Sequence, residues 1–345
     1  MLRKKQQMTR ILSYNILVGG QPRINQITAM IQAADPDVVG LVEATNPRVV
    51  ETLAKRLGMQ YRISAPGQNS ADWQVAVLSR LPIIHTEVHI CPGILTKPLL
   101  EVCVEEAEGS RLTIFVTHLT ASFTYGRAGD SIRRDEVREI LRIMAPLQGT
   151  PHLLMGDFNA LAPGDRLKGS ILLRYLVAMD QRRKTDAEGS IGHPYLNFVV
   201  PPAFHIFNPM LRVIPHSKLL SAIFDELTTL YAPHGSISLL LKAGYTDSFR
   251  YTNPRALGFT CPASAPAGRI DYIFASPEMA WRLTRCKILT EGNGLRGENA
   301  SDHYPIVAEF GECVNIEQDD EDWRDTAGVP RAASSLPGSG MSPEN

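Results

Sequence analysis

The stretch HLLMGDFNA, residues 152–160, begins as a buried strand and ends with polar side chains. Its first half is apolar, and Gly156 separates that half from Asp157 and Asn159. Successive side chains alternate along an extended chain, so we expect Asp157 and Asn159 to lie on one side and Phe158 to pack on the other. A surface turn is the alternative interpretation, and other parts of the sequence decide between the two.

The composition is typical of a soluble globular protein, with 44% hydrophobic and 21% charged residues among 345. This length permits one large α/β domain of about 250–300 residues. The net charge of −1 gives no global basic field of the kind that nucleic-acid binders carry. A small basic groove remains compatible with this neutral total.

The cysteines and the apolar runs indicate a cellular compartment. Five cysteines are scattered without CxxC spacing, which argues against a disulfide framework or a structural zinc site. The basic residues 1–10 precede a segment too short and too polar for a signal peptide. No run approaches ~20 apolar residues, so we expect no membrane span. These features predict a cytoplasmic protein, which we expect to be a monomer.

Apolar runs between turn residues predict many strands, and apolar residues at helical spacing predict helices among them. Beyond the first two helices, the predicted strands cover residues 59–64, 73–79, 83–90, 98–105, 111–118, 152–156, 269–275, 285–290 and 304–310. Hairpins are mixed with helical crossovers in this order. The pattern therefore predicts an α/β (α+β) four-layer sandwich, in which two packed mixed β-sheets are flanked by helices.

The sequence predicts one main domain, residues 9–310, with two segments of different character. Residues 161–246 are rich in Pro and aromatic side chains, include a predicted helix at 218–230, and have the character of an insertion or a lid. Residues 311–345 are acidic and then rich in Pro, Ser and Gly, which predicts a disordered tail.

Polar side chains at the ends of apolar strands recur beyond the opening stretch. The set consists of Asn15, Glu43, His118, Asp157, Asn159, Asp271, Asp302 and His303. Burying one carboxylate costs several kcal/mol unless it is paired or bound to a metal. A single such residue could be a turn former that bonds its own backbone. The whole set is much harder to explain in that way.

The chemistry of this set favours hydrolysis of a phosphate ester. Carboxylate and amide oxygens suit Mg²⁺ or Mn²⁺ better than zinc, and the zinc motif HExxH is absent. A histidine beside an aspartate supplies a general base near neutral pH. The sequence has neither the GxSxG of a serine hydrolase nor the GxxxxGK[ST] of a P-loop.

Six blocks occur in an order that resembles the endonuclease/exonuclease/phosphatase superfamily. They are SYNI (13–16), LVEA (41–44), THL (117–119), GDFNA (156–160), RIDYIF (269–274) and SDHYPIVAEF (301–310). The resemblance implies an endonuclease/exonuclease/phosphatase-like catalytic domain over residues 9–310, interrupted at 161–246. It also implies a hydrolase that depends on Mg²⁺ or Mn²⁺.

The resemblance further implies a role for each residue of the set. Glu43 would be the principal metal ligand with Asn15 beside it, and Asp302 would be a metal ligand or would position the histidine. His303 would activate the attacking water, and Asp271 would orient its imidazole. Asp157 would lie near the nucleophile or the leaving group. Asn159 and His118 would bind the substrate by donating to its non-bridging phosphate oxygens.

The substrate remains open among nucleic acid, phospholipid and small-molecule phosphate esters. Abasic-site endonucleases of the superfamily carry Asp where this chain has Leu17 and Tyr where it has His118, so both departures favour other branches. The two leading interpretations are an endonuclease-like phosphodiesterase and a lipid or small-molecule phosphatase of the sphingomyelinase or inositol-phosphatase type. A catalytically silent member that binds a phosphorylated partner is a third.

Several further positions allow two interpretations each. Arg133 and Glu136 match a family helix but also fit a plain surface helix, and Thr260 fits a family position or a turn. Asp247 is expected to be structural. The basic residues of 166–184 could bind phosphate or form a solvated helix face. Residues 195–215 could form an apolar lid or lipid contact, or an irregular excursion packed on the core.

Overall fold

The computed structural model describes residues 8–65, 74–106, 109–121, 127–186, 188, 191–200 and 202–311. The chain divides into two compact units, residues 1–311 and 312–345. The predicted tail lies outside the described residues from Glu312 onward. All of the described strands and helices belong to the first unit.

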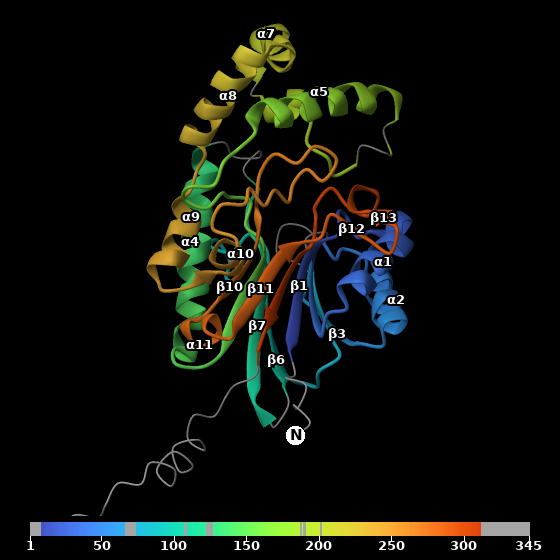
Figure 1. Ribbon diagram of the computed structural model, residues 1–345, viewed down its shortest axis with the longest axis vertical. Coiled ribbons are helices and arrows are strands. Elements are labelled where there is room, and N and C mark those ends of the chain that lie inside the picture. The colour runs from blue at the N-terminus through green and yellow to red at the C-terminus, as the bar shows by residue number, and fades with distance from the viewer. Residues whose placement is uncertain are drawn as a thin grey trace, which may run out of the picture. The chain divides into compact units, whose positions relative to one another are not determined.

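Two six-stranded sheets form the centre of this unit (Figure 1). The first has the order β11-β14-β1-β2-β4-β3, and the second has the order β5-β6-β7-β8-β10-β9. The strands of the first sheet are β1 (Thr9–Asn15), β2 (Val38–Val42), β3 (Gln60–Ile63), β4 (Val75–Ser79), β11 (Leu283–Ile288) and β14 (Ile306–Phe310). Those of the second are β5 (Ile83–His89), β6 (Leu99–Glu105), β7 (Arg111–His118), β8 (His152–Asp157), β9 (Thr246–Asp247) and β10 (Asp271–Ala275).

Both sheets are mixed, as the sequence predicted. In the first sheet β1 pairs with β2 in parallel, and in the second β7 pairs with β8 in parallel; the other pairs are antiparallel. Every residue of β2, β4, β8 and β10 is buried, which explains why these strands form continuous apolar runs in the sequence.

The two sheets pack face to face on Val, Ile and Leu side chains from both. The contact between β2 and β8 is close: a Cβ on Gly40 would lie 2.4 Å from Cε of Met155. A small residue in the first sheet therefore makes room for a large one in the second. This contact brings the ends of β1, β2, β7 and β8 to the same region of the molecule.

Helices cover the outer face of each sheet, which completes the four layers. On the first sheet, α1 (Ile24–Ala34) and α2 (Pro47–Leu57) bury Ile27, Ile31, Val50 and Leu53. On the second, α4 (Arg127–Met144) and α9 (Gly235–Lys242) complete another apolar cluster. Gly58 ends α2 in the left-handed conformation, which glycine adopts readily at a helix C-terminus.

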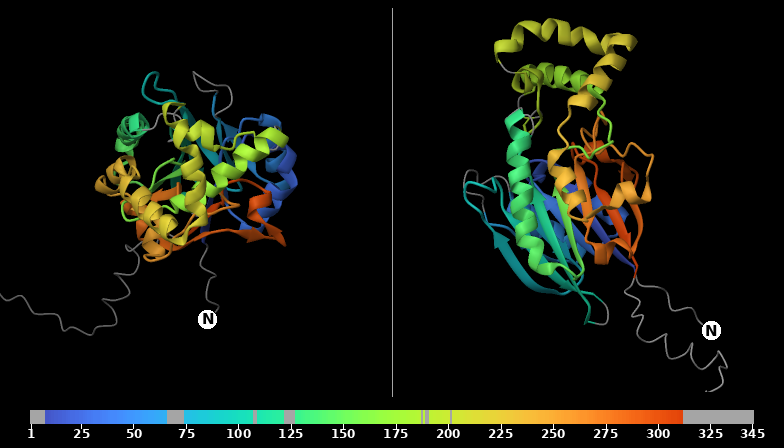
Figure 2. Two further views of the ribbon diagram at one scale, coloured as in Figure 1. Left: turned by 90° about the horizontal axis from the view of Figure 1, so that it is seen from above. Right: turned by 90° about the vertical axis from the view of Figure 1, so that its left-hand side faces the viewer.

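Residues between β8 and β9 form a helical excursion at one end of the sandwich (Figure 2). It contains α5 (Gly169–Thr185), α6 (Leu196–Val199), α7 (Asn208–Val213) and α8 (Lys218–Tyr231), and the last confirms the helix predicted at 218–230. These helices share an apolar cluster of their own. Among the described residues, no helix is both long enough and apolar enough to cross a membrane.

Short elements complete the described chain. They are α10 (Ser248–Thr252), α11 (Pro277–Ala280), the ribbon β12 (Glu291–Gly292) and β13 (Leu295–Arg296), and 3-10 turns at Gln21–Arg23, Ala145–Leu147, Pro202–Phe207, Ile214–His216 and Gly297–Asn299.

The opening stretch forms β8 up to Asp157 and Phe158 packs in the outer apolar cluster, but the extended backbone predicted at Asn159 was wrong. Asn159 has φ 48°, so the chain turns there instead of continuing as an extended strand. Gly156 has φ 141°, and a Cβ at this position would lie 1.9 Å from the carbonyl oxygen of Thr117 on β7. A glycine is therefore required where β7 and β8 approach each other beside their polar ends.

Replacing Gly156 by Ala should destabilise the protein strongly, because the new methyl group would overlap backbone atoms of β7. We expect a loss of about 3 kcal/mol in the free energy of unfolding, measured by urea denaturation. Gly149→Ala is the matched control, because Gly149 also has a positive φ but nothing lies within 4 Å of its Cβ position. It should cost only about 1–2 kcal/mol. Equal losses in the two variants would contradict the close approach.

Candidate active site

Three polar side chains line up across the second sheet. His118 is paired in register with Asp157, and Asp157 is paired with Asp271. Because β8 runs parallel to β7 and antiparallel to β10, the ends of β7 and β8 meet the beginning of β10. A single row across three strands thus holds a histidine and two carboxylates side by side.

The first sheet contributes four more residues of the predicted set. Asn15 ends β1, Glu43 follows β2, and Asp302 and His303 precede β14. The Asn15 side chain joins the two sheets, because its Nδ2 donates to Oε1 of Glu43 at 3.1 Å and to Oδ2 of Asp157 at 3.1 Å. Its Oδ1 accepts the backbone N–H of Leu17 at 3.0 Å. Asn15 therefore fixes the positions of two acids that come from different sheets.

His303 lies between the two aspartates of the second sheet. Its Nδ1 is 2.9 Å from Oδ2 of Asp271, and its Nε2 is 3.8 Å from Oδ2 of Asp157. The backbone N–H of Asp271 donates to Oγ1 of the buried Thr260 at 3.3 Å, which holds the start of β10. Although burial favours the neutral ring, the Asp271 carboxylate and other nearby anions raise the pKa of His303 well above its ordinary value.

Asp157 and His118 have environments that oppose their charged forms. Burial and the neighbouring Asp271 raise the pKa of Asp157 to about 7. Burial, followed by the positive charges of Lys97 and His303, lowers the pKa of His118 well below its usual value. The two side chains lie 3.7 Å apart, between Nε2 of His118 and Oδ2 of Asp157. The site therefore contains one imidazole that stays neutral, His118, and one that readily binds a proton, His303.

Glu43 and Asp302 form the acidic part of the site nearest the first sheet. Glu43 has φ 58°, and its Oε2 accepts the backbone N–H of Val18 at 2.8 Å. Burial and the negative charge of Asp302 raise the pKa of Glu43. Burial also opposes ionisation of Asp302, but His303 and His193 more than offset it and lower its pKa. Two buried acids that repel each other favour a cation between or beside them.

Asn159 lies in the site although its backbone is not extended. Its N–H donates to Oδ1 of Asp157 at 2.9 Å, and its Nδ2 donates to the carbonyl oxygen of Leu119 at 3.1 Å. The turn after β8 therefore carries the amide back over the end of β7. The sequence placed Asn159 in the right region with the wrong backbone conformation.

Three side chains of the site have no signal in the motifs. Lys97, just before β6, donates from Nζ to the Leu119 carbonyl at 2.9 Å, and burial lowers its pKa to about 8 despite the nearby acids. Arg23 donates to the carbonyl oxygens of Leu17 and Ala300. His193 of the excursion lies 3.4 Å from Asp302, between Nδ1 and Oδ2. His193 lies outside the six sequence blocks, so the sequence gives no sign of this contact.

Arg133 and Glu136 are buried inside α4, so the surface-helix alternative is wrong. Glu136 accepts hydrogen bonds from Thr96 and from both the backbone N–H and the hydroxyl of Thr120. Arg133 donates from Nη1 to the carbonyl oxygen of Thr120 at 3.1 Å. These contacts hold the two segments that carry Lys97 and His118.

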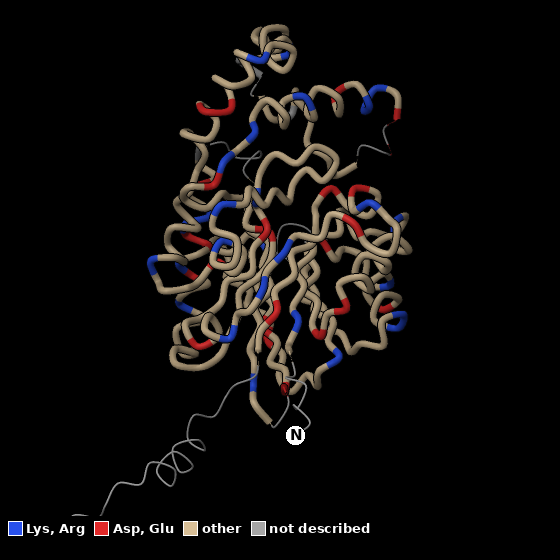
Figure 3. Tube along the Cα trace, viewed as in Figure 1, with Lys and Arg blue, Asp and Glu red and all other residues tan. Residues whose placement is uncertain are grey.

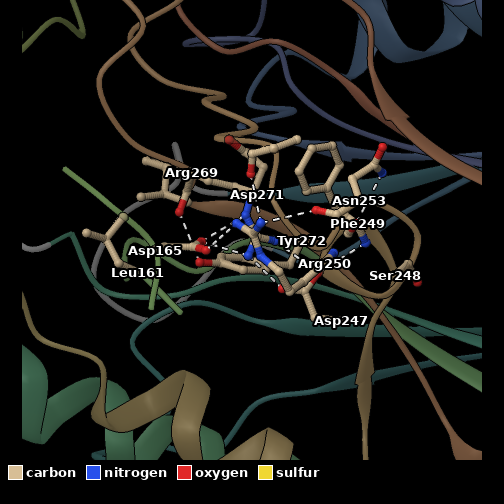
Figure 4. Close-up of polar contacts among 12 residues, drawn as sticks. Leu161, Asp165, Asp247, Ser248, Phe249, Arg250, Asn253, Arg269, Asp271 and Tyr272 are labelled. Carbon is tan, nitrogen blue, oxygen red and sulfur yellow. Dashed lines mark hydrogen bonds and ion pairs between the residues drawn. The ribbon is translucent and has the colours of Figure 1, made fainter. Parts of the chain in front are cut away.

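A buried ion-pair network supports β10 from the other side (Figure 4). The Arg269 guanidinium lies 2.7 Å from a carboxylate oxygen of Asp165 and 2.7 Å from one of Asp247. Its carbon Cζ lies 4.4 Å from the ring centroid of Tyr272. Asp247 also caps α10, as expected of a structural residue. The network links Asp165, in the loop after β8, to Arg269, two residues before Asp271.

The basic residues of the excursion are distributed between partners and solvent. Arg166 pairs with Glu226 and Lys168 with Asp225, at 3.3 Å each. Arg182, Arg183 and Lys184 lie on the exposed last turn of α5. The solvated-face interpretation of this charge cluster therefore agrees with the structure.

A family model described as the Endonuclease/Exonuclease/phosphatase family matches residues 12–303. The chain belongs to this family. The match contains all six sequence blocks apart from the end of the last one. A search of curated proteins gave no match.

Solved structures from the same family share the fold. An AP endonuclease from Archaeoglobus fulgidus is 15% identical, with a TM-score of 0.56, and the match covers 88% of this chain and 99% of that one. A 3′ phosphatase, NExo, from Neisseria bound to a product DNA hairpin is 18% identical, with the same TM-score and coverage. Humanised TDP2 of D. rerio is 17% identical with a TM-score of 0.53, over 88% of this chain and 99% of that one.

Replacing Asp271 by Asn should lower the pKa of His303, because the carboxylate that stabilises the imidazolium is lost while the side-chain shape is kept. The test is an NMR titration of the histidine rings in metal-free protein. The shift should be downward toward or below the ordinary value near 6.5. His152, whose pKa is lowered by burial at the start of β8, should titrate as before and serves as the internal control. An unchanged His303 titration would contradict the ion pair.

Proposed function

We propose that the protein is a metal-dependent hydrolase of phosphate esters that uses a water activated by His303. The observation that carries the proposal is the buried group of Asp157, Asp271 and His303, whose ligand atoms all lie within 4.8 Å of one another. This group adjoins Glu43 through the Asn15 bridge. Membership of a family of nucleases and phosphatases supports the same reaction class.

The acids beside the first sheet fit a hard divalent cation. Glu43 and Asp302 offer carboxylate oxygens, and burial, followed by the charge of Asp302, raises the pKa of Glu43, both of which a cation would counteract. We assign Mg²⁺ or Mn²⁺ to Glu43 and Asp302, with Asn15 as the amide beside them. Such an ion would supply positive charge to the phosphate oxygens of the substrate.

His303 is the proposed general base. Asp271 accepts from Nδ1 and so leaves Nε2 facing Asp157. Because the pKa of His303 is raised, its Nε2 proton must first leave; with Nδ1–H held by Asp271, the neutral ring then presents the lone pair of Nε2 to a water molecule near Asp157. Asp157 is suited to exchange a proton near neutral pH, because its pKa is about 7.

The remaining side chains are proposed to stabilise the phosphate as negative charge builds on it. Asn159 offers an amide, His118 a neutral imidazole, and Lys97 an ammonium, and the contacts of Asn159 and Lys97 meet at the Leu119 carbonyl. Donors fixed before the reaction cost little reorganisation during it. This group would bind the non-bridging oxygens on the face opposite Glu43 and Asp302.

An endonuclease-like phosphodiesterase is the first candidate within this class, because two of the similar structures are described as an AP endonuclease and a 3′ phosphatase bound to DNA. A lipid phosphatase is the second, and the exposed apolar helices of the excursion favour it. The silent-member hypothesis has less support, since every residue type that the chemistry needs is in place.

Hydrolysis should require Mg²⁺ or Mn²⁺ and should fall about 10²–10⁴-fold in His303→Ala, the usual contribution of a general base. The substrates are an aryl phosphodiester, plasmid DNA, single-stranded RNA, sphingomyelin vesicles and an inositol polyphosphate, each with and without EDTA. His85→Ala, at an exposed histidine of β5, is the control and should keep full activity. Undiminished turnover in His303→Ala would refute the assignment.

The pattern across the substrates identifies the branch. Hydrolysis of DNA alone would support the nuclease, and hydrolysis of a lipid alone would support the phospholipid phosphatase. Metal binding without turnover of any substrate would instead support the catalytically silent member.

A further inference from the structure

One face of α8 is apolar and lies in solvent. Leu219, Ile223, Leu227 and Leu230 recur at helical spacing, and their exposed fractions are 70%, 49%, 47% and 74%. The opposite face packs on α5, where Phe224 joins the apolar cluster of the excursion. The helix therefore exposes most of its apolar side chains and packs mainly Phe224 and polar side chains inside the protein.

The exposed face continues onto α7 and the turn before it. Ile206 is 80% exposed and Met210 is 61% exposed, with Phe207 and Val213 beside them in the sequence. We call this surface the apolar ridge, and it consists of Ile206, Phe207, Met210, Val213, Leu219, Leu220, Ile223, Leu227, Leu230 and Tyr231. Single exposed apolar side chains are common on soluble proteins, but ten of them on α7, α8 and the turn before α7 indicate an interaction surface.

The segment that leads into α8 carries basic but no acidic residues. From residue 189 to residue 224 the sequence contains no Asp or Glu, whereas Arg212 and Lys218 lie in this segment. Figure 3 shows Lys and Arg but no Asp or Glu at the α7 end of the excursion. Arg212 pairs with the buried Asp180 on α5 at 2.6 Å, and Lys218 is exposed at the start of α8. The ridge thus presents apolar and basic side chains together.

The acids nearest to the ridge in sequence are neutralised within the excursion. Asp225 and Glu226 on α8 pair with Lys168 and Arg166, in the chain that leads into α5. These two ion pairs leave the apolar face of α8 without an unbalanced negative charge beside it.

The excursion that carries the ridge also contacts the proposed active site. The hydroxyl of Tyr175 on α5 lies 2.7 Å from Nδ1 of His193, and the same nitrogen lies 3.4 Å from Oδ2 of Asp302. The hydroxyl of Thr229 on α8 bonds both the N–H and the carbonyl of Leu167, in the chain leading from β8. A surface that binds the ridge would therefore lie on the same end of the molecule as the strand-end residues (Figure 2).

We propose that the apolar ridge docks on the surface of an anionic phospholipid bilayer. The ridge is built on the outermost helices of the unit, so it protrudes (Figures 1 and 2). A deformable interface accepts such a protruding helix, which buries its apolar side chains at the acyl boundary. Lys218 would face the anionic headgroups, and the absence of acids from residue 189 to residue 224 removes the repulsion that would oppose it.

Docking would hold a membrane surface at the end of the sandwich that carries the excursion (Figure 2). The docking is independent of catalysis, whereas the use of a membrane phosphate ester as substrate rests on the proposed function. The two claims therefore need separate readouts, one of vesicle binding and one of hydrolysis of a soluble aryl phosphodiester.

The test is flotation of the full chain with vesicles of equal parts phosphatidylglycerol and phosphatidylcholine, and with vesicles of phosphatidylcholine alone. The native chain should float with the anionic vesicles and much less with the neutral ones. Leu219→Glu combined with Leu230→Glu should reduce binding at least about tenfold, because two charges enter the apolar contact. Both side chains are more than two-thirds exposed, so the helix should remain folded, as circular dichroism checks.

The matched control is Ile84→Glu combined with Trp281→Glu, which places two charges at exposed apolar positions of the sandwich outside the ridge. It should bind vesicles like the native chain. No flotation of the native chain, or equal loss in the ridge and control variants, would overturn the proposal. A ridge-dependent dimer seen by light scattering, without vesicle binding, would overturn it in favour of a second copy as the occupant.

Hydrolysis of the aryl phosphodiester separates this proposal from the proposed function. Both double variants should keep native turnover of this soluble substrate. Ridge-dependent flotation without turnover of this or any other substrate of the panel would support the docking surface and refute the proposed function. Turnover without flotation would support the proposed function and overturn the docking surface.

Discussion

The structure depends on the register of β8, which holds Asp157 between a parallel neighbour and an antiparallel one. This register places His118 on one side of Asp157 and Asp271 on the other. Gly156 makes the register possible, because no side chain fits against the Thr117 carbonyl. A shift of β8 by one residue would turn Asp157 to the opposite face of the sheet, away from His118 and Asp271. The site is therefore a consequence of how three strands pair.

The acids that this pairing brings together must also be stabilised by positive charge or by hydrogen-bond donors. His303 compensates Asp271 by direct contact, and Asn15 donates to both Glu43 and Asp157. Burial, followed by repulsion from a neighbouring acid, raises the pKa values of Glu43 and Asp157. Such residual repulsion is costly for stability and useful for chemistry, since it favours a bound cation and a proton that can move.

The sequence predicted the fold and most of the candidate site because both depend on local patterns. Fully buried strands such as β2 form unbroken apolar runs, and polar residues just past them mark the strand ends. The residues that the sequence missed act through long-range pairing: Lys97 reaches the Leu119 carbonyl, and His193 reaches Asp302 from the excursion. Asn159 was placed correctly but given an extended backbone, because its left-handed turn has no glycine to mark it.

The most direct test of the central claim is anomalous diffraction from crystals soaked in Mn²⁺. If the strand-end acids form a metal-dependent phosphoesterase site, one strong manganese peak should lie against the carboxylate of Glu43, near Asp302 and Asn15. The peak should disappear in Glu43→Gln, which keeps the side-chain shape but removes the charge. A manganese peak away from these residues, or an unchanged peak in the variant, would contradict the account.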